Sequence, residues 1–85
     1  MKDTIMAWKI TRDILDNKNV YIASLHDQVE MPHKFRLLDD DGDLYFEGWS
    51  NDNNSQRAFG PLDWAMADSG CTEIQYFNDG KWETL

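Results

Sequence analysis

The sequence predicts an α+β fold, in which an antiparallel sheet of five or six strands carries one short helix packed on one face. Three observations predict it. Two alternating apolar runs flank an Asp-rich turn within Lys34–Trp49, and a second pair of such runs occupies Cys71–Leu85. Between these two hairpins, Pro61–Ser69 carries the start and stop signals of a helix. Residues 1–85 are expected to form a single domain with one core, because single domains reach about 100–150 residues.

The first third of the chain predicts two strands separated by a short helical turn. Apolar residues at every second position from Met6 to Ile10 indicate a half-buried strand over Ile5–Thr11. The stretch TRDILDNKN that starts at Thr11 is expected to form one helical turn, which its asparagines then end. Val20–Leu25 has the β-branched and aromatic content of a strand, and residues 26–32 form a polar connection.

The hairpin over Lys34–Trp49 allows two registers. A two-residue loop at Asp41 and Gly42 pairs Leu37 with Phe46, Arg36 with Glu47, Leu38 with Tyr45, and Lys34 with Trp49. A four-residue loop over Asp39–Gly42 pairs Leu37 with Leu44, Phe35 with Phe46, Arg36 with Tyr45, and Lys34 with Glu47. Both place the apolar set on the core face, namely Phe35, Leu37, Leu44 and Phe46. Both gather the other set on the opposite face: Lys34, Arg36, Tyr45, Glu47 and Trp49. A three-residue loop mixes the two sets and is rejected on parity.

After this hairpin the sequence predicts a surface loop and then the helix. Residues 50–58 are rich in Asn, Asp and Ser, the residues of turns. Gly60 is expected at the N-cap, Pro61 at the first helical position, and Gly70 as the left-handed residue that ends the helix. The stripe expected to face the sheet consists of Leu62, Ala65, Met66 and Ser69.

The final hairpin is expected to turn over residues 78–80. A three-residue loop with a left-handed Gly80 pairs Tyr76 with Trp82 and Ile74 with Thr84. We prefer it to a two-residue loop because it leaves the polar residues of both strands together on the solvent side.

The four tryptophans fall into two groups. Trp8, Trp64 and Trp82 are expected in the core, as large aromatics are in small domains. Trp49 is the exception, because both accepted registers place it on the face away from the core, beside Tyr45 and Arg36.

The charge of the chain restricts its partners. The net charge is -8, with 16 acidic against 8 basic residues. The acidity lies in the second part: residues 1–36 carry six cations and five acids, whereas the remainder carries two cations and eleven acids. A chain this acidic is expected to bind neither nucleic acid directly nor an anionic membrane, because both would repel it. Its lone cysteine and the absence of a long apolar run or a leader favour a cytoplasmic protein.

No pattern in the sequence predicts catalysis, a cofactor or a metal. An EF-hand loop centred on Gly42 would need carboxylates where Leu37 and Gly48 stand. Cys71 is expected to be a small buried residue, and His26 and His33 to be exposed. The chain is therefore interpreted as non-enzymatic.

Four segments resemble small uncharacterised acidic proteins of bacteria, phages and mobile elements. They are MAWKIT from Met6, KFRLLDDDGDLYFEG from Lys34, FGPLDWA from Phe59, and GCTEIQYFNDGKW from Gly70. The resemblance covers most of the chain and carries no agreed activity. It implies a setting in which small acidic domains inhibit host defence, as anti-CRISPR and anti-restriction proteins do, some of them by imitating the charge of DNA.

Two hypotheses follow for function. In the first, an acidic protein-binding module occupies a basic nucleic-acid-binding surface of a partner protein through the carboxylates of Asp39, Asp40, Asp41, Asp43, Glu47 and Asp52. In the second, a housekeeping interaction domain of unknown pathway binds its partner through the face of Arg36, Tyr45 and Trp49. The second rests on residue type, because Trp, Tyr and Arg dominate binding hot spots. The oligomeric state stays open.

Overall fold

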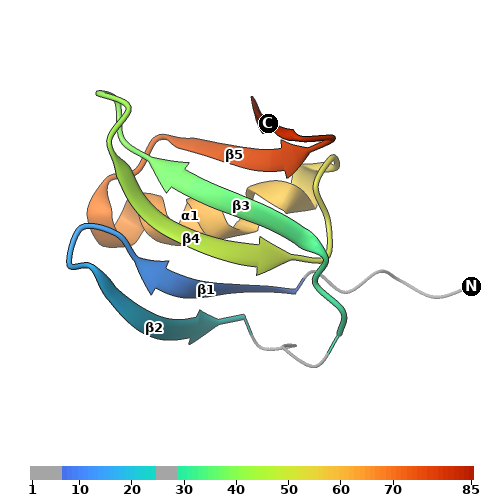
Figure 1. Ribbon diagram of the computed structural model, residues 1–85, viewed down its shortest axis with the longest axis horizontal. Helices are drawn as coiled ribbons and strands as arrows, with labels where there is room; N and C mark the ends of the chain where they lie inside the picture. Colours follow the sequence, from blue (N-terminus) through green and yellow to red (C-terminus); the bar gives the residue numbers. More distant parts are fainter. Residues whose placement is uncertain (1–6, 25–28) are drawn as a thin grey trace, which may run out of the picture.

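The computed structural model describes residues 7–24 and 29–85. These residues form one antiparallel sheet of six strands in the order β2-β1-β4-β3-β5-β6 (Figure 1). A short 3-10 helix η1 and the helix α1 connect β4 to β5. The predicted α+β class is therefore confirmed. The strands are β1 (Trp8–Asp13), β2 (Lys18–Ala23), β3 (His33–Leu38), β4 (Leu44–Ser50), β5 (Glu73–Asn78) and β6 (Lys81–Thr84).

The first two strands form a hairpin, so the predicted helical turn is wrong. β1 continues to Asp13 and β2 begins at Lys18, which leaves residues 14–17 as the turn. The Asp13 carboxylate accepts a hydrogen bond from the Asp16 N–H at 3.0 Å. A distant contact fixes the turn, because the Ile14 N–H donates to the Tyr45 carbonyl at 2.9 Å. The predicted strand positions Ile5, Met6 and Leu25 lie outside the described residues.

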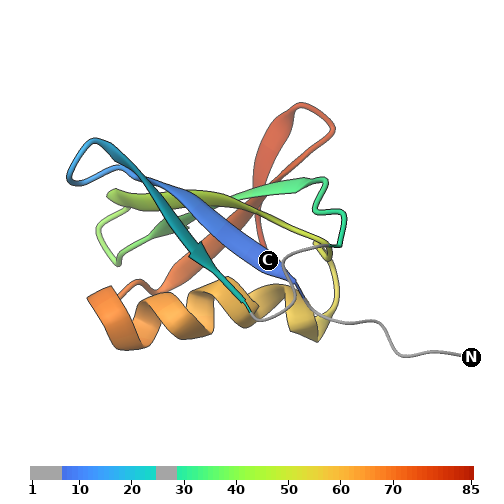
Figure 2. The same cartoon turned by 90° about the horizontal axis from the view of Figure 1, so that it is seen from below.

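The helix α1 (Gly60–Ser69) packs on one face of the sheet, and no other described element lies on the opposite face (Figure 2). Gly70 has a φ of 77° and donates to the Ala65 carbonyl at 3.0 Å, so the predicted helix end is confirmed. The start is shifted, since η1 (Gln56–Phe59) runs directly into the helix and makes Phe59 the N-cap in place of Gly60. Met66, predicted to face the sheet, is 54% exposed.

The core lies between α1 and the sheet. Its fully buried large side chains include Ile10, Phe35, Leu37, Ile74 and Tyr76. Trp8 and Trp64, predicted in the core, lie on its side of the sheet but are half-buried, and they pack against this cluster with their ring centroids 6.2 Å apart.

The hairpin of β3 and β4 combines two of the loops considered from the sequence. Its central pairs, Lys34 with Trp49, Arg36 with Glu47, and Leu37 with Phe46, are those of the two-residue loop. A β-bulge at Tyr45 then shifts the register, so that Leu38 pairs with Leu44. At the tip the Asp39 N–H donates to the Asp43 carbonyl, which closes a loop of three residues. This is the loop length that was rejected from the sequence because it mixes the two faces. Because the bulge adds one residue to β4, Phe35, Leu37 and Phe46 stay in the core although the loop has three residues. Leu44, which was predicted on the same face, is half-buried and lies outside the core cluster, because the register shift pairs it with Leu38.

The hairpin of β5 and β6 turns over two residues, so the predicted three-residue loop is wrong. Asn78 pairs with Lys81, and the turn residues Asp79 and Gly80 have φ values of 53° and 86°. Two positive φ values define the type I′ turn, whose twist matches that of the flanking strands. The predicted pair of Tyr76 and Trp82 therefore does not form.

This shift moves one tryptophan to the other side of the sheet. Tyr76 pairs with Glu83, and Trp82 pairs with Phe77. Since a slip of one residue exchanges the two faces of a strand, Trp82 lies outside the core in which it was expected.

None of the helices within residues 7–24 and 29–85 has the length and apolar character needed to cross a membrane.

Candidate functional site

The face of the sheet opposite α1 is the candidate site, and we call it the open face. Strand pairing places its side chains in two rows, because residues paired across antiparallel strands share a face. One row runs Lys9, Trp49, Lys34, and the other runs Arg12, Glu47, Arg36, Gln75, Thr84. Phe77 and Trp82 extend the open face along the final hairpin.

A guanidinium stacked on an indole forms the centre of the open face. The Arg36 Cζ lies 4.2 Å from the centroid of the Trp82 ring. The Arg36 Nε donates to the Gln75 Oε1 at 2.7 Å, and the Phe77 ring meets the Trp82 ring edge-on at 5.1 Å. Gln75 thus fixes the plane of the guanidinium while Trp82 supports its face.

A second hydrogen-bond layer holds Gln75 in place. The Gln75 Nε2 donates to the Glu73 Oε2 at 2.8 Å, and the Thr84 hydroxyl donates to the same oxygen. The hydrogen bonds from Thr84 and Gln75, together with the nearby charge of Arg36, keep the pKa of Glu73 below its ordinary value. Four side chains from β3, β5 and β6 therefore form one connected network.

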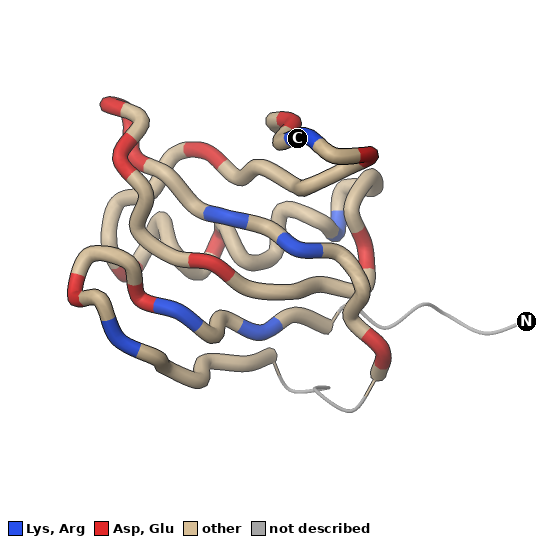
Figure 3. The backbone as a smooth tube through the Cα atoms, viewed as in Figure 1, with Lys and Arg blue, Asp and Glu red and all other residues tan. Residues whose placement is uncertain are grey.

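The cations of the chain concentrate on the open face. Lys9, Arg12, Lys34 and Arg36 are four of the eight Lys and Arg residues. Figure 3 shows Lys and Arg positions along β1 and β3, whereas most acidic positions lie in turns and at the perimeter. The Lys34 Nζ lies 5.9 Å from the centroid of the Trp49 ring, so two of the four cations stand over indoles.

Tyr45 does not join Arg36 and Trp49, as the alternating pattern predicted. Its bulge position turns it toward the core cluster, against which it packs. Burial, the charge of Asp39 and a hydrogen bond to the Asp39 carboxylate raise the pKa of the Tyr45 hydroxyl. The predicted face of Arg36, Tyr45 and Trp49 is thus corrected to the open face, in which Trp82 stands next to Arg36.

The predicted acidic contact residues occupy three separate places. Asp39, Asp40, Asp41 and Asp43 lie in the β3–β4 tip, Glu47 lies on the open face between Arg36 and Arg12, and Asp52 follows the opposite end of β4. The structure therefore does not bring these carboxylates together on one surface.

Two of these carboxylates hold loops in place. The Asp39 Oδ1 accepts from the N–H groups of Asp41 and Asp43, each at 2.9 Å, and the hydrogen bond from Asp43 is the main reason that the pKa of Asp39 is lowered. Burial raises the pKa of Asp52, but hydrogen bonds from Ser55 and Asn54 outweigh this effect and leave the pKa below its ordinary value. Both side chains therefore accept hydrogen bonds that stabilise their own loops.

The carboxylate oxygens of Asp39, Asp41 and Asp43 come within 4.8 Å of one another. The hydrogen bonds of Asp39 to the loop account for this approach, since turn residues are Asp and Gly for conformational reasons.

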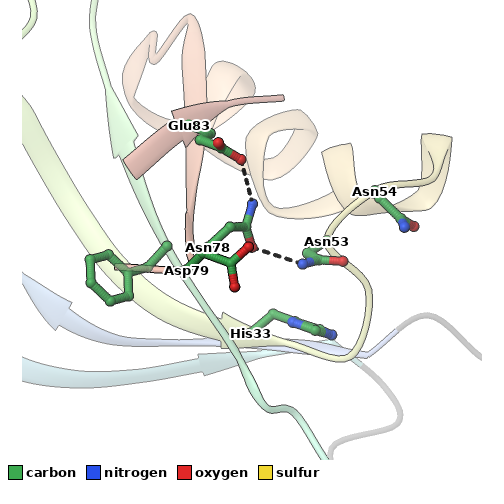
Figure 4. Close-up of a pocket in the computed structure, with 7 residues that line it drawn as sticks. His33, Asn53, Asn54, Asn78, Asp79 and Glu83 are labelled. Atoms are coloured by element: carbon green, nitrogen blue, oxygen red, sulfur yellow. Dashed lines mark hydrogen bonds between the residues drawn. The ribbon is translucent and has the colours of Figure 1, made fainter. Parts of the chain in front are cut away.

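A polar hollow of about 520 Å³ lies between the start of β3, the loop after β4 and the final hairpin, and Phe77 is its one lining residue from the open face (Figure 4). A chain of amides crosses it, in which the Asn53 Nδ2 donates to the Asn78 Oδ1 at 2.9 Å and the Asn78 Nδ2 donates to Glu83 at 3.2 Å. His33, expected to be exposed, is half-buried in its wall, and His26 lies outside the described residues. Cys71 does not line this hollow.

Cys71 is fully buried, as predicted. Burial and the carboxylates of Asp39 and Asp68 raise the pKa of its thiol to about 11. At pH 7.5 we expect a disulfide reagent to modify the native thiol roughly a hundredfold more slowly than the unfolded thiol, because only the thiolate reacts. The release of thionitrobenzoate with and without denaturant measures both rates. Equal rates would contradict the burial of this side chain.

The chain matches no protein-family model, no curated protein and no solved structure.

The open face contains residues that sequence reasoning missed, chiefly Trp82, Gln75 and Phe77. One signal was available for Trp82. Asp79 and Gly80 form the Asp-Gly pair that favours a two-residue type I′ turn, and that turn places Trp82 on the same side of its hairpin as Phe77 and Gln75.

Proposed function

We propose that this chain is a non-enzymatic protein-binding module whose contact surface is the open face. One observation carries the proposal. On a chain with a net charge of -8, half of the Lys and Arg residues gather with Trp49 and Trp82 on the side of the sheet that no described element covers.

The residue types and their order support binding. Trp and Arg are the residues that contribute most to hot spots, and their side chains lose less entropy on binding when they are already held. Gln75 and Trp82 hold Arg36, and Lys34 stands over Trp49. Two further aromatic residues are exposed, with Tyr21 at 62% and Phe77 at 44%.

The arrangement of nucleophilic and basic groups supports a role without catalysis. Nucleophilic catalysis by a cysteine needs a base within hydrogen-bond reach. Among the described residues, the groups that shift the pKa of the Cys71 thiol are carboxylates, and they raise it, which suppresses the thiolate.

The open face is tested by capturing partners from bacterial lysate with immobilised protein. We expect wild type to retain a partner that Arg36→Glu and Trp49→Ala each lose, while both variants keep the melting temperature within a few degrees. The physical reason is that both side chains already stand at the surface of the sheet. Capture that survives both changes would exclude the open face as the contact surface.

A second candidate function is inhibition of a host defence protein by the acidic tip, as anti-CRISPR and anti-restriction inhibitors of nucleic-acid-binding proteins act. Its support is that Asp40, Asp41 and Asp43 are all exposed at the protruding end of the β3–β4 hairpin (Figure 1). Carboxylates at such an end could enter a groove lined with Lys and Arg.

The same capture experiment separates the two candidates. The matched variant is Asp40→Asn with Asp41→Asn, because these carboxylates hold no hydrogen bond of the loop whereas Asp39 does. If the tip is the contact, this double variant and raised salt should both abolish capture, and Arg36→Glu should not.

A further inference from the structure

We infer that the open face recognises a carboxylate in an acidic segment of a protein partner, and that the two Nη groups of Arg36 hold it. This inference rests on the proposed function and specifies the partner of the same surface.

The Arg36 guanidinium is held in an orientation that suits an acceptor with two oxygens, such as a carboxylate. Its Nε is occupied by Gln75 and its face by Trp82, whereas its Nη1 and Nη2 have no partner within residues 7–24 and 29–85. A guanidinium presents its donors as a planar fork that matches both oxygens of a carboxylate. Since the fork is already oriented by its neighbours, little freedom remains to be lost on binding.

Arg12 on the same face provides a contrast. Its Nη1 donates to the Asn19 Oδ1 at 3.1 Å, and its Nη2 donates to the Asn17 side chain. Both Nη groups of Arg12 are therefore already hydrogen-bonded, to Asn17 in the β1–β2 turn and to Asn19 in β2, whereas those of Arg36 are open.

The surrounding charges favour a carboxylate over a nucleic acid. Lys9 and Lys34 flank Trp49 in the neighbouring row and add positive charge beside Arg36. Glu47 and Glu73 stand on either side of Arg36, and the whole chain is strongly acidic. A nucleic-acid backbone holds its phosphates at close, fixed spacing and would meet this repulsion along its length. A flexible acidic peptide needs to place only one carboxylate on the Arg36 guanidinium and can turn the others toward solvent.

Aromatic stacking points the same way. Single-stranded nucleic acids bind exposed aromatic faces through their bases. The Arg36 guanidinium covers one face of the Trp82 ring at 4.2 Å, so a base that stacked on that face would have to displace it.

The test is a titration of the full ¹⁵N-labelled chain with a hexaglutamate peptide, followed by the Arg36 Nε–H and Trp82 indole signals. Hexaglutamine and a hexathymidylate oligonucleotide are titrated in parallel. We expect saturable shifts of both signals with hexaglutamate only, weakening as salt rises. Arg36→Lys keeps the charge and loses the fork, so it should weaken binding about tenfold or more.

Two further variants keep the inference falsifiable if Arg36→Lys disturbs the fold. Arg12→Lys is the matched control on the same face and should leave the affinity nearly unchanged, because its fork is occupied. Glu47→Gln should tighten binding by about two- to fivefold, because it removes a carboxylate that repels the ligand. Equal losses for the two arginine variants, or no effect of Glu47→Gln, would overturn the role of Arg36.

The remaining outcomes are equally decisive. Tighter binding of hexathymidylate would assign the surface to nucleic acid, and shifts that grow with protein concentration alone would assign it to a second copy of the chain. Either result would overturn a protein partner with an acidic segment. If hexaglutamate fails to bind but partner capture still depends on Arg36 and Trp49, the proposed function stands and only the carboxylate inference fails.

Discussion

Gly48→Ala is expected to abolish the folded sheet or to destabilise it by about 3 kcal/mol or more, the upper range for forcing extra atoms into a packed interior. A Cβ at this position would lie 2.0 Å from the Lys9 carbonyl oxygen, 2.7 Å from the Phe35 Cζ and 3.0 Å from the Ile10 Cα. β4 lies between β1 and β3, so β1 can move away only by breaking its pairing with β4. The expected loss is large beside a total stability of roughly 4–13 kcal/mol for a chain of this length.

Urea unfolding followed by tryptophan fluorescence measures this effect. Gly42→Ala is the matched control, because its Cβ would meet nothing within 4 Å and only its φ of 82° opposes the change. That control should cost about 1–2 kcal/mol. Adding Phe35→Leu to Gly48→Ala should not restore stability, since the Lys9 carbonyl belongs to the backbone. Restoration would show that the clash lies with the Phe35 ring alone.

Phe35→Ala should lower the free energy of unfolding by about 3–5 kcal/mol, the cost of removing a buried aromatic ring. The Phe35 side chain is 0% exposed, meets the Tyr76 ring at 5.8 Å and covers Gly48 on the paired strand. Its removal leaves a cavity between α1 and the middle of the sheet, because Gly48 on the paired strand has no side chain to fill the space.

Phe77→Ala is the control for this prediction. Phe77 is the same residue type in the same sheet, but it is 44% exposed on the open face. Its loss should cost about 1 kcal/mol, mainly its contact with Trp82. Similar losses for Phe35 and Phe77 in urea unfolding would refute the assignment of the core to the side of α1.

Local signals were sufficient for several elements. Alternation separates the two faces of the central strands in Lys34–Trp49, although it leaves two registers open. The end of α1 follows from Gly70, whose φ of 77° suits a residue without a Cβ. The burial of Cys71 follows from its place between the helix and a strand. In each case the deciding interactions lie within a few residues along the chain.

Loop lengths could not be read in the same way. Alternatives that differ by one residue are nearly equal in local terms, yet each exchanges the two faces of a strand. At the β3–β4 tip, the bulge at Tyr45 is accompanied by contacts to Asp39 and the core cluster. In the last hairpin, the type I′ turn puts Tyr76 inside, where its hydroxyl donates to the Ala58 carbonyl at 2.8 Å.

Only part of the candidate site could be predicted from the sequence, because the rest depends on which strands pair. Arg36 and Trp49 are placed on one face by any accepted register of their own hairpin, whereas Trp82 and Gln75 reach Arg36 only because β5 pairs with β3. That pairing joins residues that are separated by η1 and α1 in the sequence. The alternation of residues within one segment does not predict which distant strand pairs with it.

The amino-acid sequence by itself determined the α+β class, the central hairpin, the helix and the acidic character of this protein, because alternation, turn residues and composition act locally. Only the tertiary structure decided which face each aromatic residue occupies and which strands meet. Those choices depend on a single residue of loop length and on contacts such as Tyr76 with Ala58 and Arg36 with Trp82, which exist only after the chain has folded.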